Sequence, residues 1–192
     1  MNGKDKKFGP QFIPTENMLH DQHTVTDATS GLSGSGMNQR ETQIEFALAL
    51  ALLGDNKGIA MLQKACDDTH TPAHLRMYAA KYILDTKNGG CLSTVENFLL
   101  SAPDLGSRQL AFSEITRFQH VSDADAQKIF AALVTSLRDA EPQIRTGASG
   151  ALAELGNQSA VPELQKAIAA ENGDAVRSSM HSDLRKLQEK VP

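Results

Sequence analysis

Histidines are the residues of this chain whose spacing could support chemistry, because two pairs lie close enough in the sequence to share a metal ion. His20 and His23 form one pair, but no further ligand lies near them. His70 and His74 form the other, and Pro72 between them argues against the helical geometry that would place both on one face. No glycine-rich phosphate loop, nucleophile elbow or pair of catalytic carboxylates stands out. We therefore predict no catalytic residue, no metal site and no cofactor.

Two cysteines, Cys66 and Cys91, lie beside or within apolar helical stretches. Two thiols at this separation make neither a disulfide framework nor a zinc site. We expect both to be small buried hydrophobic side chains. No signal peptide is visible, and the longest apolar run, residues 46–53, is too short to cross a bilayer. These features predict a cytoplasmic protein without membrane insertion, unless a leader was removed or the chain belongs to a larger protein.

The composition narrows the classes of partner. The chain of 192 residues is 40% hydrophobic and 22% charged, which is typical of a soluble folded protein. Aromatic residues make up only 5% and there is no Trp, which disfavours ligands that stack on rings, such as sugars or nucleobases. The 19 Lys and Arg against 23 Asp and Glu give a net charge of −4. A nucleic-acid partner is therefore not expected, because it requires a local excess of positive charge.

The elements that would position any functional residue begin after residue 36. Residues 1–36 are rich in Gly, Pro, Ser and Thr, have no period and end in a linker-like segment, so we expect a flexible N-terminal arm. Five apolar residues could anchor this arm: Phe8, Phe12, Ile13, Met18 and Leu19. In residues 37–192 apolar residues recur at helical spacing with no convincing strand signal. This pattern predicts an all-α domain.

Arginines reveal an internal repeat in that domain. They stand at Arg76, Arg108, Arg145 and Arg177, which are 32, 37 and 32 residues apart. Small or apolar residues follow three and seven positions after each arginine and share one helical stripe. These residues are Ala79, Ala111, Ala148 and Met180, and then Ile83, Ile115, Leu152 and Leu184.

We predict four helical hairpins and a final single helix. Leu-Gly pairs at residues 53–54 and 155–156 are equivalent stops, with glycine as the left-handed cap. The predicted helix ranges are 40–53 and 57–67, 73–86 and 92–101, 105–119 and 123–138, 142–155 and 159–170, and finally about 175–190. One hairpin of ~33 residues cannot bury enough surface to offset its ordering entropy, so the hairpins should stack around a shared core.

The repeat resembles the HEAT-like repeat family, in particular its short bacterial form and the repeats of phycobilisome lyases. The resemblance covers about residues 40–190. It rests on the Pro-x-x-Arg opening at residues 142–145, the Ala-Leu-x-x-Leu-Gly turn at 151–156 and the Ala-Val-Pro-Glu-Leu segment at 160–164. It implies a right-handed α-α superhelix. It also implies a structural ladder in which the four arginines pair with acidic residues that precede them, namely Asp68, Asp104, Asp139 and Asp174.

The resemblance further implies which face could bind a partner. The second helices of a HEAT-like stack line the concave face, and their expected exposed residues are Gln63, Lys64, Glu96, Asn97, Gln127, Lys128, Gln165 and Lys166. Their mixed charge and amide content favour a protein or peptide. The predicted function is therefore a non-catalytic protein–protein interaction scaffold. The alternatives are a subunit of a lyase-type enzyme, since phycobilisome lyases attach chromophores as two-chain complexes, a HEAT-like DNA glycosylase, or a module of a longer protein.

The two ends of the repeat domain differ. The last helix should bury Val176, Met180, Leu184, Leu187 and Val191 and expose Ser178, Asp183, Arg185, Lys186 and Glu189, the pattern of a polar-backed cap. The first helix is apolar nearly all round, which is typical of a helix covered on most sides. We expect the N-terminal arm to fold back and cover it, and a partner protein or a second copy of the chain is the alternative cover.

Overall fold

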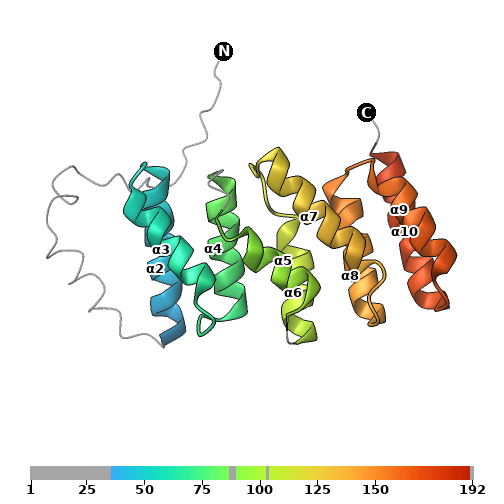
Figure 1. The fold of residues 1–192 in the computed structure, drawn as a ribbon, viewed down its shortest axis with the longest axis horizontal. Helices are drawn as coiled ribbons and strands as arrows, with labels where there is room; N and C mark the ends of the chain where they lie inside the picture. Colours follow the sequence, from blue (N-terminus) through green and yellow to red (C-terminus); the bar gives the residue numbers. More distant parts are fainter. Residues whose placement is uncertain (1–35, 87–89, 103, 191–192) are drawn as a thin grey trace, which may run out of the picture. The chain divides into compact units, whose positions relative to one another are not determined.

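The computed structural model describes residues 36–86, 90–102 and 104–190, and the regular elements in these ranges are all helices. They are α2 (Gly36–Leu52), α3 (Asn56–Asp67), α4 (Ala73–Asp85), α5 (Leu92–Leu100), α6 (Leu105–Ile115), α7 (Asp123–Ser136), α8 (Pro142–Leu155), α9 (Ala160–Ala170) and α10 (Asp174–Glu189) (Figure 1). The chain divides into two units, Met1–Arg40 and Glu41–Pro192. The predicted arm and its apolar anchors lie outside the described residues. The all-α class is confirmed.

The predicted hairpins are confirmed, with small differences at the helix ends. Helix α6 ends at Ile115, earlier than predicted, because the chain after it is held by other contacts. The carboxylate of Asp85, at the end of α4, accepts hydrogen bonds from the backbone N–H groups of Gln119 and His120 at 3.0 and 3.1 Å. A contact between distant segments thus competes with the helical pattern in this loop.

Local capping explains where several helices begin and end. Asp55, Asp104 and Ser122 each stand at an N-cap, where the side chain accepts a hydrogen bond from a backbone N–H of the first turn. Gly54 and Gly156 adopt positive φ values of 82° and 72°, as predicted for the two Leu-Gly stops. These φ values are costly for most residues that carry a side chain, so glycine favours both turns.

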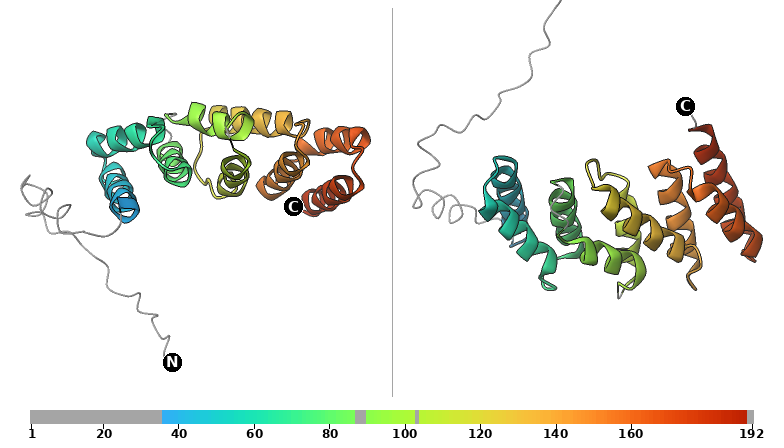
Figure 2. Two further views of the ribbon diagram at one scale, coloured as in Figure 1. Left: turned by 90° about the horizontal axis from the view of Figure 1, so that it is seen from below. Right: turned by 45° about the horizontal axis from the view of Figure 1, so that its top comes forward.

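The hairpins of the unit Glu41–Pro192 form two layers (Figure 2). The first helices of successive hairpins, α4, α6 and α8, pack against one another in order, and α10 packs against α8. In the other layer, α5 packs against α7. Between the layers lies the predicted apolar stripe: Ala79, Ala111, Ala148 and Met180 are fully buried, as are Ile83, Ile115 and Leu152, while Leu184 is half-buried. A repeat of equivalent residues therefore forms one continuous core.

Two predictions about single residues are wrong. Cys66 and Cys91 are buried, as expected, but they are joined in a disulfide, because the fold brings their Cα atoms to 5.9 Å. Asp183 is buried in the last helix instead of exposed, and its Oδ2 accepts a hydrogen bond of 2.7 Å from the Ser149 hydroxyl on α8. A hydroxyl donor on the neighbouring helix thus satisfies a carboxylate that its position alone would place in solvent.

Candidate protein-interaction surfaces

The four repeat arginines occupy the same place in the fold. Each guanidinium donates to a backbone carbonyl at or just beyond the end of the preceding second helix. The acceptors are the carbonyls of Cys66 for Arg76, Leu99 for Arg108, Asp139 and Ala140 for Arg145, and Glu171 for Arg177. The last carbonyls of a helix have no partner within the helix, so Arg76, Arg108 and Arg177 cap the ends of α3, α5 and α9, whereas Arg145 holds the loop after α7.

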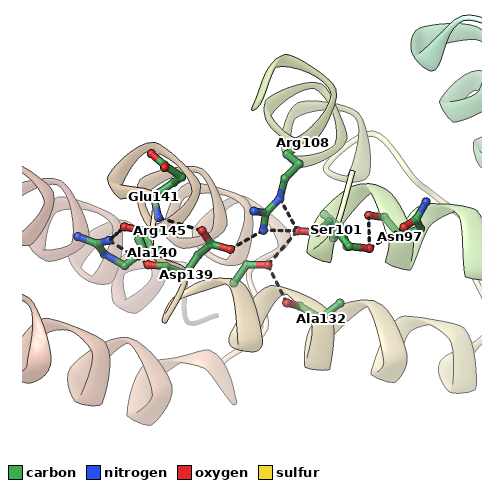
Figure 3. Close-up of polar contacts among 10 residues, drawn as sticks. Asn97, Ser101, Arg108, Ala132, Asp139, Ala140, Glu141 and Arg145 are labelled. Atoms are coloured by element: carbon green, nitrogen blue, oxygen red, sulfur yellow. Dashed lines mark hydrogen bonds and ion pairs between the residues drawn. The ribbon is translucent and has the colours of Figure 1, made fainter. Parts of the chain in front are cut away.

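Two of the arginines also form ion pairs that link successive second helices. Arg108 donates to Asp139 at 2.7 Å, so it connects the end of α5 to the loop after α7 (Figure 3). Arg145 forms a bidentate pair with Glu171, at 2.6 and 2.9 Å, and so connects the loop after α7 to the loop after α9. Of the other predicted acids, Asp174 pairs with Arg177 within α10, Asp104 caps its own helix through Ser107, and Asp68 accepts hydrogen bonds within its own loop.

These ion pairs change the acidity of their carboxyl groups. The Arg145 guanidinium, together with the backbone N–H of Gly173, lowers the pKa of Glu171 below its ordinary value. Burial tends to raise the pKa of Asp139, but the hydrogen bond from Arg108 and the backbone N–H of Glu141 outweigh it, and the net change is a lowering. Both carboxyl groups are therefore charged at neutral pH and fully engaged within the stack.

Sequence reasoning missed Glu171 as the partner of Arg145. A signal existed, because Asp139 and Glu171 each stand six residues before the next arginine. The corresponding residue before Arg108 is Ala102, which is apolar. Because Ala102 supplies no carboxylate to Arg76, the Arg76 guanidinium lies instead over the ring of Phe98 on α5, 5.1 Å from the ring centroid.

The predicted binding residues lie along the layer of second helices. Six are exposed, and two are half-buried, Gln63 and Glu96. Gln63 donates to Asp67 at 2.8 Å, and Lys166 donates to Glu163 at 2.8 Å, so part of the polarity is used within each helix. The exposed residues Lys64, Asn97, Gln127, Lys128, Gln165 and Lys166 present amides and ammonium groups. This surface has no aromatic side chain among its predicted members.

A second candidate surface is apolar and belongs to the first hairpin, α2–α3. Four large hydrophobic side chains are exposed there: Phe46 by 40%, Leu52 by 71%, Leu53 by 67% and Met61 by 38%. We call these four residues the first-hairpin apolar surface. Among the described residues, the other exposed large hydrophobic side chains, Tyr78, Leu100 and Leu155, lie singly on α4, α5 and α8. The sequence predicted that this end needs a cover.

A shallow groove of about 520 Å³ crosses the first-helix layer, over α6, α8 and α10. Gln109 of α6 donates to Gln143 of α8 at 3.2 Å beside it, and no charged side chain lines it. The charged residues Asp174, Arg177 and Arg185 line a separate groove along α10.

The described residues contain no group of three or more His, Cys, Asp and Glu side chains that could hold a metal ion. His70 faces Asp68 at 3.2 Å and His74 faces Glu41 at 3.5 Å, so the two imidazoles have different partners. His20 and His23 lie outside the described residues. In the same described part, no helix is long and apolar enough to span a membrane.

The fold and its surfaces define a protein of stacked helical hairpins, an α-solenoid. No protein-family model and no curated protein matches the chain. A solved structure of similar fold is the complex of CpcE and CpcF of phycocyanin lyase from Nostoc sp. PCC7120, with a TM-score of 0.53 and 16% sequence identity. The match covers 85% of this chain and 99% of that chain. At this identity the likeness concerns the fold.

Proposed function

We propose that this chain is a protein-binding subunit of a two-chain assembly. The observation that carries the proposal is the first-hairpin apolar surface, because exposed large apolar side chains at one end of a solenoid are typical of a protein interface. A partner would bury more apolar area of four side chains than their present surroundings do, namely those of Phe46, Leu52, Leu53 and Met61.

The similar solved structure supports one form of this function over another. That protein is a phycocyanin lyase, and its CpcE and CpcF chains form a complex. Among the functions that the sequence suggests, this likeness favours a lyase-type subunit over a stand-alone scaffold. In that form the chain supplies the helical framework, and a second protein completes the assembly that handles a chromophore.

The layer of second helices is the proposed site for the protein on which the assembly acts. Its exposed amides and ammonium groups, among them Gln127, Lys128 and Gln165, can hydrogen-bond a polypeptide of mixed charge. The first-hairpin apolar surface and this layer would then serve different partners. The N-terminal arm and a second copy of the chain are the alternative occupants of the apolar surface.

Site-specific photo-crosslinking tests the proposal. A photoreactive residue placed at Leu53 is expected to capture one protein of defined mass in extract of the source cells, because Leu53 is 67% exposed at the proposed interface. The matched control is Leu155, which precedes Gly156 as Leu53 precedes Gly54 and is 39% exposed in the fourth hairpin. The probe at Leu155 is not expected to capture the protein that the probe at Leu53 captures.

The identity of the captured protein separates the two forms of the function. A different helical-repeat protein, whose mixture with this chain attaches a chromophore to an acceptor protein, would support the lyase-type subunit. Capture of a second copy of this chain would support self-association instead. If neither probe captures a protein, or both capture the same ones equally, the proposal of a partner at the first hairpin fails.

A further inference from the structure

The disulfide Cys66–Cys91 lies inside the stack, at the junction of the first two hairpins. Cys66 is in the last turn of α3, and Cys91 is the N-cap of α5. Their exposed fractions are 0% and 3%. The bond therefore joins the second helices of the first and second hairpins.

The other junctions in this layer are joined by ion pairs. Arg108–Asp139 connects α5 to the end of α7, and Arg145–Glu171 connects the end of α7 to that of α9. The place equivalent to Asp139 and Glu171 in the second hairpin is Ala102, which cannot form an ion pair with Arg76. The junction of α3 with α5 is thus the one of these three that lacks the carboxylate and contains the disulfide.

Without the covalent bond, the packing of α3 on α4 and two hydrogen bonds at Cys66 still hold the first hairpin on the second. Arg76 donates to the Cys66 carbonyl at 2.9 Å, and the Thr94 hydroxyl donates to the same carbonyl at 3.4 Å. In a stack of repeats each hairpin is held by its nearest neighbours alone, and a terminal hairpin has only one neighbour. A weakened junction at this place therefore acts on the first hairpin more than on any other.

We propose that the Cys66–Cys91 disulfide replaces the missing ion pair and keeps the first hairpin ordered on the second. Its formation removes two electrons and two protons from the two thiols. A small-molecule disulfide or a protein disulfide oxidoreductase accepts them and becomes two thiols. Because both sulfur atoms are buried, a reductant reaches the bond only when the first hairpin opens, so the bond is a lasting structural link and not a rapid switch.

This inference bears on the proposed function without depending on it. The first-hairpin apolar surface lies on α2 and α3, so the disulfide orders the elements that present it. Such bonds persist in oxidising compartments and are rare in the cytosol, which counts against the cytoplasmic location predicted from the sequence.

Hydrogen–deuterium exchange of the full chain tests the inference with no partner present. The oxidised protein is compared with protein that was reduced in denaturant and refolded under reductant. We expect amides of residues 41–67 to exchange about tenfold or more faster in the reduced protein. Amides of residues 142–189 should exchange at the same rate in both forms, which shows that the reduced chain is folded.

The variant Cys66→Ala/Cys91→Ala supplies the control. Its exchange in residues 41–67 should match that of the reduced wild type and should not respond to reductant. Equal exchange of these residues in oxidised and reduced wild type would overturn the inference, as would two free thiols in the protein purified without reductant. A partner that binds elsewhere would defeat the proposed function but would leave the exchange result intact.

Discussion

At the scale of single residues, the arginines do two structural jobs at once. Each donates to a backbone carbonyl at or beyond the end of a second helix, and two of them add an ion pair across a repeat junction. The side chains of Arg108 and Arg145 are only 11% and 17% exposed, so little of either guanidinium is available to a ligand. We therefore propose that Arg108 and Arg145 belong to a structural ladder and not to a binding site.

The pair of Arg145 and Glu171 makes stability depend on pH. The pKa of Glu171 is lowered in the folded protein, so the pair stabilises the fold above the ordinary pKa of a glutamate, and this contribution is lost as the pH falls towards the folded value. Glu171→Gln should destabilise the protein by about 1–3 kcal/mol at pH 7. It should also reduce the loss of stability on acidification below about pH 5.

Urea unfolding between pH 7 and pH 3 measures both effects. Glu189→Gln is the control, because Glu189 is exposed on α10 and its loss should keep the pH dependence of the wild type. A Glu171→Gln protein whose stability falls as steeply as the wild type's below pH 5 would show that the ion pair contributes nothing.

The residue scale is also where sequence reasoning fell short. The arginine period and the buried stripe that follows it could be read directly, because helical spacing fixes which side chains share a face. The disulfide could not, because it joins segments that are distant in the sequence, and for Glu171 the sequence offers only its place six residues before Arg177. The burial of Asp183 could not be predicted for the same reason, because Ser149 on a neighbouring helix supplies the hydrogen bond that its buried carboxylate accepts.

At the scale of elements, the helices were predictable because their ends carry local signals. Gly54, Gly156, Asp104 and Pro142 act through their own backbone or first turn. The end of α6 was not predictable to the residue, because Asp85 of α4 fixes the loop after it. The close approach of α6 and α8 is likewise a tertiary feature, and its only sign in the sequence is a glycine, Gly147, within α8.

Two glycines of α8 test that close approach. A Cβ atom at Gly147 would lie 2.7 Å from Cδ2 of the Phe112 ring, whereas a Cβ at Gly150 meets nothing within 4 Å. Gly147→Ala should destabilise the protein by about 1–3 kcal/mol, because α6 and α8 must move apart. Gly150→Ala should stabilise it by about 0.5–1 kcal/mol through helix propensity.

Denaturation midpoints of the two variants give the comparison, since both place the same methyl group in the same helix. If Gly147→Ala were as stable as Gly150→Ala, the packing of Phe112 against α8 would be incorrect.

At the scale of the whole molecule, one apolar core runs through the described hairpins, and each hairpin depends on its neighbours. The two ends of the stack expose different kinds of side chain. The last helix turns charged residues such as Arg185 and Lys186 to solvent, which is how a stack can end. The first hairpin exposes Phe46, Leu52, Leu53 and Met61, which is how a stack can offer an interface.

The fold class could be predicted from the sequence because periodicity is a property of many residues together. The partner could not be predicted, because an interface needs two complementary surfaces and one of them belongs to another chain. The exposed fractions of Leu52 and Leu53 show which residues of the first hairpin are open to a partner, whereas the sequence predicts only that the apolar first helix is covered.

The most direct test of protein binding at the first hairpin is the affinity of the crosslinked partner for surface variants. Leu52→Ser/Leu53→Ser should raise the dissociation constant by about tenfold or more in isothermal titration, because each exposed leucine loses its burial in the interface. Leu155→Ser, at the equivalent turn of the fourth hairpin, should bind like the wild type. Unchanged affinity of the double variant, with its fold intact by circular dichroism, would show that the partner does not bind at the first hairpin.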